Sequence, residues 1–314
     1  MSKIPVKSQV FSANTMLEDD LEPPSPPWAR ANVHEWPEAL LSLADELTRE
    51  SEERTMVSSL QGSMSDVSSG FAHLELKGLR DLTVLVNSAS KDPKTAARLR
   101  QIQKVNADLS LVPAILKTLS RHQAARNPDA AVAPSLAIQV EREALQLLQG
   151  VLLVDPDSGV LAVENSAVET LLERVSGSGD TTVRAAGLDA LLCMHLTSHG
   201  RLALQRMRHL QGASKVASVL VSSNQPLKLR HKCAEFLLLL LGHVHPSGAR
   251  ETKFTDGLGG QPELPPVDDG VQNILGDVIL DELLADMEFD RPDNTERLYE
   301  RTLHIVQMTD MLAK

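Results

Sequence analysis

Apolar residues recur along most of this chain at spacings of three and four, the period of a helix that buries one face. After Trp36, Pro37 suits the first turn of a helix, which is expected to end near Ser51. A loop is predicted for residues 58–70, which are rich in Ser and Gly. Further helices are predicted around residues 76–86 and 111–119, and an Ala- and Pro-rich linker over residues 121–135.

Three stretches of the chain follow one pattern, and this pattern indicates a repeat. They cover residues 140–148, 183–191 and 229–237. Each opens with an aliphatic residue, has a small residue four positions later and an apolar pair at seven and eight. The small residues are Ala144, Gly187 and Cys233. The copies begin 43 and 46 residues apart, within the roughly 40–47 residues of armadillo and HEAT repeats. A shorter match links residues 159–163 with 200–204.

These patterns predict an all-α protein, an armadillo- or HEAT-like stack of helical hairpins. Residues 1–35 are expected to be disordered, because their acidic, Pro-rich composition cannot bury enough surface to offset chain entropy. The helical repeat domain is expected over residues 36–245, a flexible Pro- and Gly-rich loop over 246–270 and C-terminal helices over 271–314. Ser166 and Glu169 have the spacing of a capping box, which predicts a helix start.

Composition supports this fold and narrows the class of protein. Leu, Val and Ala dominate the apolar residues and only 3% of the chain is aromatic, a composition that favours helices over strands. Two cysteines do not make a disulfide framework, and the net charge of −11 argues against nucleic acid as a partner. The first residues lack an apolar run of signal-peptide length, and the run Phe236–Leu241 is too short to insert into a membrane. A soluble cytoplasmic protein is expected.

Charge is distributed unevenly along the chain. Between Asp189 and Glu235 the sequence has no acidic residue, whereas residues 256–294 hold eleven acidic residues and one basic residue. The basic residues of the first window are Arg201, Arg206, Arg208, Lys215, Lys228, Arg230 and Lys232. One interpretation is two solvated faces. The other is a basic strip that binds an acidic surface of a partner and that the acidic segment masks until the partner displaces it.

Three of the apolar segments also resemble a known family. Residues 144–156, 186–193 and 227–241 are Leu-rich and similar to the fungal septation-initiation protein called cell division control protein 14, which is distinct from the phosphatase of that name. The resemblance covers roughly residues 70–245. It implies an armadillo-like scaffold without catalytic activity, a Ste20-like protein kinase of the septation initiation network as partner, and a role in cytokinesis at the spindle pole body.

The sequence offers little for catalysis or metal binding. Cys193 and His195, His231 and Cys233, and His243 and His245 are each two residues apart. On a helix such residues point in different directions, and structural zinc sites use wider spacings. The chain has no Gly-x-Ser-x-Gly elbow, Walker pattern or His-Glu-x-x-His motif. We expect neither a cofactor nor a small-molecule substrate.

The leading hypothesis is therefore a non-catalytic adaptor that binds a protein kinase through the basic strip. Two alternatives stay open. One is another armadillo-type binding protein, such as a chaperone nucleotide-exchange factor. The other is an enzyme with an unrecognised site.

Overall fold

The computed structural model describes residues 38–124, 134–177, 179–244, 269–284 and 294–312. Within these ranges all regular structure is helical, with thirteen α-helices, one 3₁₀ helix and no strand, as the sequence predicts. The chain divides into two compact units between Glu52 and Glu53. No helix of the described ranges has the length and apolar character needed to span a membrane.

The helices follow one another in groups of three after an opening pair. The pair is α1 (Glu38–Ser68) and α2 (Ala72–Lys91). The first group is α3 (Pro93–Val105) with η3 (Ala107–Leu109), α4 (Leu111–Ala124) and α5 (Pro134–Val154). The second is α6 (Ser158–Glu164), α7 (Ala167–Ser176) and α8 (Thr181–Leu196), and the third is α9 (Gly200–His209), α10 (Gly212–Val221) and α11 (Leu227–Val244). The chain closes with α12 (Asp269–Leu284) and α13 (Asn294–Leu312).

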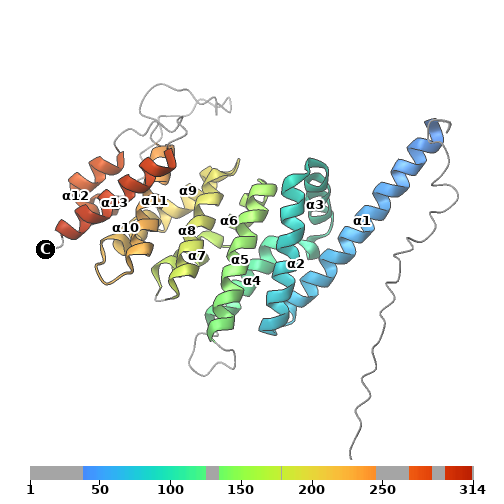
Figure 1. Ribbon diagram of the computed structural model, residues 1–314, viewed down its shortest axis with the longest axis horizontal. Coiled ribbons are helices and arrows are strands. Elements are labelled where there is room, and N and C mark those ends of the chain that lie inside the picture. The colour runs from blue at the N-terminus through green and yellow to red at the C-terminus, as the bar shows by residue number, and fades with distance from the viewer. Residues whose placement is uncertain (1–37, 125–133, 178, 245–268, 285–293, 313–314) are drawn as a thin grey trace, which may run out of the picture. The chain divides into compact units, whose positions relative to one another are not determined.

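Within the unit that begins at Glu53, equivalent helices of successive groups pack side by side (Figure 1). The long helices α2, α5, α8, α11 and α13 form one row. The middle helices α4, α7, α10 and α12 form a second row, each packed against a long helix. This arrangement is the predicted stack of helical layers, and it places the C-terminal helices α12 and α13 on its last layer.

The three sequence copies lie in the three long helices α5, α8 and α11. Their small residues occupy one equivalent place and are buried, with Ala144 and Cys233 at 0% exposure. At the same place in α8, a Cβ added to Gly187 would lie 3.4 Å from Val175 of the neighbouring middle helix α7. The place is therefore a packing position between a long helix and the middle helix before it, as the repeat pattern indicates.

The predicted loop over residues 58–70 is wrong, because α1 continues to Ser68. Leu60, Met64 and Val67 are buried at spacings of four and three, so this stretch is a helix with a narrow apolar face. The Ser and Gly residues of this stretch favoured a loop, and its apolar face has too few residues to indicate a helix by periodicity. The face packs closely on α2, where a Cβ on Gly78 would come within 2.6 Å of the Ser63 carbonyl oxygen.

The apolar pattern alone predicted no element for residues 93–105, where the structure has α3. Asp92 begins this helix, since its carboxylate accepts hydrogen bonds from the backbone N–H of Lys94 at 3.1 Å and of Thr95 at 3.0 Å. These bonds and the Thr95 hydroxyl hold the pKa of Asp92 below its usual value, the hydroxyl being the largest influence. Pro93 occupies the first helical position, where its missing N–H costs nothing.

The predicted capping box at Ser166 is also wrong. Ser166 does precede α7, but its backbone is left-handed with φ of 60° and its side chain makes no capping hydrogen bond. The turn between α6 and α7 is only two residues long, Asn165 and Ser166, and this tight reversal sets the conformation. Glu169, the other member of the expected box, pairs with Arg206 of α9 instead.

Several predicted segments lie outside the described residues. These are most of the linker 121–135, most of the loop 246–270 and the N-terminal segment 1–35. Within the last, Ser25 precedes Pro26, a pattern that predicts a site of proline-directed phosphorylation or, alternatively, an unmodified linker. Of the linker, residues 121–124 still belong to α4, and α5 begins at Pro134. The start of α12 at Asp269 falls just inside the predicted loop. Since α12 packs on α10 and α11, part of the acidic segment belongs to the last layer, while masking of the basic strip stays a prediction.

Candidate interaction surface

A charged residue is buried at the same place in four successive long helices. It is the second position of each sequence copy, namely Glu141, Arg184 and Arg230, and Glu75 holds this place in α2, three residues before Gly78. All four are at most 4% exposed. A buried charge is costly unless it is paired, so each must be satisfied by the layers on either side.

The two arginines bind the ends of the middle helices. Arg184 donates from Nε to the Val175 carbonyl of α7 at 2.9 Å, and Arg230 donates from Nε to the Leu220 carbonyl of α10 at 2.7 Å. Both carbonyls belong to the next-to-last residue of their helix, where backbone acceptors lack a partner within the helix. The positive guanidinium also meets the negative end of the helix dipole. The arginines thus tie each long helix to the middle helix before it.

The same arginines reach the following layer. Arg184 donates from Nη1 to Gln225 Oε1 at 2.6 Å. Arg230 donates from Nη2 to the Thr309 hydroxyl at 2.7 Å and forms an ion pair with Asp310 at 2.7 Å, both on α13. The predicted assignment of Arg230 to an exposed basic strip is therefore wrong, because this side chain joins α10, α11 and α13 inside the stack.

The two glutamates are paired with side chains from the following group. Glu75 contacts Arg121 and His122 at the end of α4. Glu141 lies 3.6 Å from Arg174 of α7, whose guanidinium also donates to the Leu119 carbonyl of α4. The sign of the charge reverses between the second and third long helices, yet each middle helix α4, α7 and α10 still has a guanidinium on a carbonyl near its end. The buried charges therefore stabilise the contacts between layers.

Lys232 is also engaged within the molecule. Its ammonium lies 2.8 Å from Asp189 of α8 and 2.9 Å from Glu235 of its own helix α11. Burial, the largest influence, lowers the pKa of Lys232, but the hydrogen bonds and charges of the two carboxylates together raise it. Lys228 is exposed in the first turn of α11, beyond the end of α10. The predicted strip is thus not one continuous surface.

Four of the predicted residues lie on the adjacent helices α9 and α10, and we call them the α9 surface: Arg201, Arg206, Arg208 and Lys215. Arg201 and Arg208 are two helical turns apart on α9, so they share a face, and both are exposed. Arg206 is 42% exposed and pairs with Glu169 of α7. Lys215 is exposed in the first turn of α10, which contacts α9. Leu202, at 42% exposure, precedes Arg206 by four residues and so shares its face of α9.

Of the six residues with metal-ligand chemistry, Cys193, His195, His231 and Cys233 have described side chains, and they form no metal-binding group. His195 Nδ1 lies 2.6 Å from the Leu191 carbonyl, and His231 Nε2 lies 2.6 Å from the Thr302 hydroxyl. Burial raises the pKa of Cys233 to about 12, which leaves the thiol protonated. In the parts of the chain that the structure describes, no three His, Cys, Asp or Glu side chains are grouped to hold a metal ion. His245 lies outside those parts.

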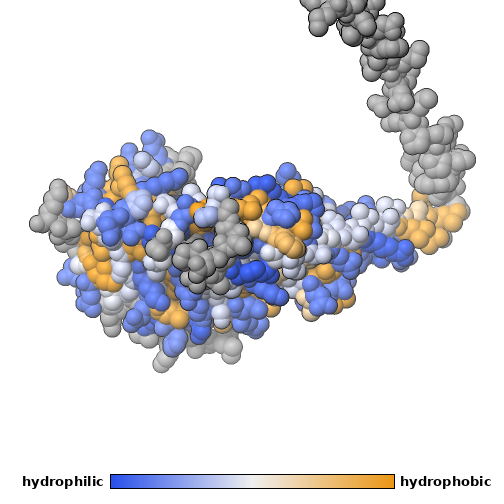
Figure 2. Space-filling model, turned by 90° about the horizontal axis from the view of Figure 1, so that it is seen from below, coloured by the Kyte–Doolittle hydropathy of each residue, from blue (hydrophilic) through white to orange (hydrophobic). Residues whose placement is uncertain are grey.

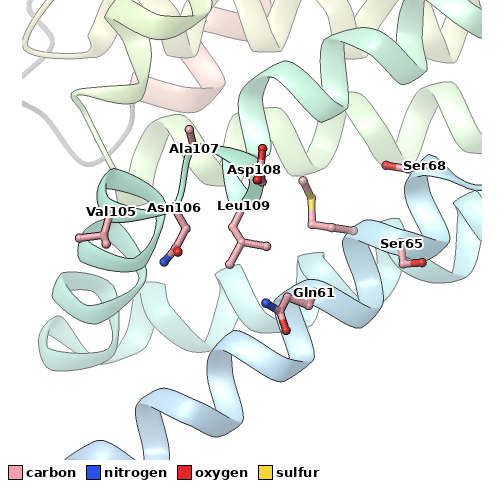
Figure 3. Close-up of a pocket in the computed structure, with 9 residues that line it drawn as sticks. Gln61, Ser65, Ser68, Val105, Asn106, Ala107, Asp108 and Leu109 are labelled. Atoms are coloured by element: carbon pink, nitrogen blue, oxygen red, sulfur yellow. The ribbon is translucent and has the colours of Figure 1, made fainter.

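Two cavities open on the first layers. One, of about 500 Å³, lies between the C-terminal half of α1 and the connection from α3 to α4 (Figure 3). Gln61, Ser65 and Ser68 approach it from α1, and Asn106 and Asp108 from the connection, with Asp108 the one titratable side chain of its lining. The other, of about 640 Å³, lies between α3 and α6 and has both basic and acidic walls.

The surface seen in Figure 2 is mostly hydrophilic, with apolar residues in separate small patches.

The chain matches no protein-family model and no curated protein at a significant level. Among solved structures it is similar to the crystal structure of an engineered protein, at 14% sequence identity and a TM-score of 0.45, over 80% of this chain and 97% of that one. So distant a likeness says nothing about function.

Proposed function

We propose that this chain is a non-catalytic scaffold that binds an acidic surface of a partner protein through the α9 surface. The observation that carries the proposal is the exposure of Arg201, Arg208 and Lys215 on two adjacent helices, α9 and α10, within a window of sequence that has no acidic residue. Grouped exposed cations attract an acidic partner and orient its approach. Exposed Leu202 supplies apolar area on the same helix, α9.

The partner we propose is a Ste20-like protein kinase of the septation initiation network. The support is the resemblance of residues 70–245 to the septation-initiation family, together with the helical repeats. Under this proposal the chain positions the kinase during cytokinesis at the spindle pole body and takes no part in the phosphoryl transfer itself.

Two features favour a protein partner over a nucleic acid. The net charge of the chain is −11, which repels a phosphate backbone at long range. Helix α9 also has no Phe, Trp or Tyr on which bases could stack. The cations of the α9 surface are therefore better suited to carboxylates that a folded partner presents.

A binding measurement with the purified full chain and such a kinase tests the proposal. Replacing both Arg201 and Arg208 with Glu should weaken binding about tenfold, because two favourable exposed pairs become repulsive. The effect should shrink at high salt. The matched control replaces Lys117 and Lys228 with Glu, since both are exposed on other elements. Equal binding by the two double variants, with their helix content intact, would refute the proposed surface.

A further inference from the structure

The stack has a second basic helix, α3, which lies outside the sequence window between Asp189 and Glu235. It carries Lys94, Arg98, Arg100 and Lys104, and the sequence from Pro93 to Ala107 contains no acidic residue. Lys94, Arg100 and Lys104 are exposed. Positive charge is therefore concentrated on α3 as well as on α9.

Both basic helices occupy the same place in their groups. α3, α6 and α9 are the first helices of the three groups, and they follow one another along one edge of the stack (Figure 1). α6 contacts α9, and the cavity of about 640 Å³ separates α6 from α3. The first helices thus line one edge of the stack, interrupted by this cavity, that is basic at both ends and has α6, a helix without Lys or Arg, in between.

The cavity between α3 and α6 has two unlike walls. Arg100, Gln101 and Lys104 line it from α3, and Asp155 and Asp157 line it on the opposite side. The acidic wall is partly engaged, since Asp155 accepts a hydrogen bond from Ser158 at 2.7 Å and Asp157 lies 3.4 Å from His199. A bound segment would therefore place its own acidic groups against the α3 wall and at the α9 end, and keep its middle uncharged.

The length of the edge sets the length of the segment that fits. Packed neighbours such as α6 and α9 are about 8–10 Å apart, and the cavity adds to the distance between α6 and α3, so α3 and α9 are separated by at least roughly 20 Å. An extended chain advances about 3.3 Å per residue, so at least roughly six residues are needed to cover this distance. We infer that the partner contributes an extended peptide segment that lies along the edge formed by α3, α6 and α9, with acidic groups at both ends and a neutral middle. This inference rests on the proposed protein-binding function and states what the partner presents.

Fluorescence anisotropy with two defined peptides and the full chain tests the inference. The first peptide has about four glutamates at each end and about six Gly and Ser residues between them, to match the separation of the basic helices. The second has the same composition with all glutamates in one block. A single-stranded oligothymidylate of similar length is the third probe. The first peptide should bind severalfold more tightly than the second, because only it reaches both basic helices at once.

Charge-reversed variants then test whether the two acidic ends of the first peptide contact α3 and α9. Replacing Arg100 and Lys104 with Glu should weaken binding of the first peptide about tenfold and abolish its advantage over the second. Replacing Arg201 and Arg208 with Glu should have the same effect, and replacing Lys117 and Lys228 should have little. Circular dichroism spectra and thermal melts confirm that each variant is folded.

The outcomes separate the inference from the proposed function. The inference is overturned if the wild-type chain binds the two peptides with equal affinity, or if replacing Arg100 and Lys104 leaves the affinity for the first peptide unchanged. In either case, loss of kinase binding on replacing Arg201 and Arg208 would still support the proposed scaffold. If the α9 variant binds both the kinase and the peptides normally, the proposed function fails as well. Tighter binding of the oligothymidylate than of either peptide would refute a peptide occupant and point to nucleic acid.

Discussion

Arg230 offers the most direct test of how the layers are joined. Replacing it with Met retains most of the buried stem and removes the guanidinium. The change deletes the hydrogen bonds to the Leu220 carbonyl and the Thr309 hydroxyl, both 2.7 Å long, and the ion pair with Asp310. Because these three acceptors belong to α10 and α13, one substitution removes the polar link that Arg230 makes between the C-terminal helix and the last full group.

The expected cost follows from the burial of each contact. A buried hydrogen bond to a charged group contributes about 1.5–3 kcal/mol, and two are lost. Asp310 is 45% exposed, so its ion pair adds less than about 1 kcal/mol after screening. The desolvation penalty of the buried guanidinium disappears with the substitution and offsets part of the loss. The net destabilisation should be about 3 kcal/mol.

Urea unfolding and hydrogen exchange measure two aspects of this loss. Repeat proteins need not unfold in a single step, so the change is expected first in the last layer. Amide protection should fall in α13 while the amides of α5 and α8 keep theirs. The control substitution Asp310→Asn removes only the half-exposed pair and should cost less than about 1 kcal/mol.

A loss below about 1 kcal/mol for Arg230→Met, with α13 as well protected as before, would refute this account of the layer contacts. The side chain would then be buried without holding the helices together. If a fully folded Arg230→Met protein bound the partner more weakly, Arg230 would belong to the interaction surface after all.

Two further substitutions test the packing. Gly78→Ala should destabilise the protein by about 2 kcal/mol, because the new Cβ would lie 2.6 Å from a backbone oxygen of α1. Gly62→Ala should instead stabilise α1 by roughly 0.5–1 kcal/mol, because a Cβ at that position has nothing within 4 Å. Equal effects of the two substitutions in thermal melts would contradict the close approach of α1 and α2. Alkylation at pH 8 followed by mass spectrometry should modify Cys193 slowly and leave Cys233 intact until the protein unfolds, because the Cys233 pKa of about 12 lies far above that pH. Equal labelling of both native thiols would show that Cys233 is accessible.

The candidate site was only partly predictable from the sequence. The absence of acidic residues between Asp189 and Glu235 pointed to Arg201, Arg208 and Lys215, which are exposed cations in the structure, because charge composition is a local property. It also included Arg230, although Glu141 and Arg184 hold the same place in the other copies. A charged residue at an equivalent position in every copy is the signal that could have identified Arg230 as part of the interior.

The sequence by itself determined the class of fold and the three long helices. Helical periodicity is a pattern of residues close together in the chain, and burial of one helix face follows from it. The same local pattern recurs around Ala144, Gly187 and Cys233, and this recurrence identifies the three long helices. It did not determine that residues 58–68 are helical, since that face has few apolar residues and is completed by α2. Only the tertiary structure decided which groups pair with the buried charges, because Thr309, the hydrogen-bond partner of Arg230 on α13, lies 79 residues away along the chain. The same long-range packing placed α3 and α9 on one edge, which no local pattern encodes.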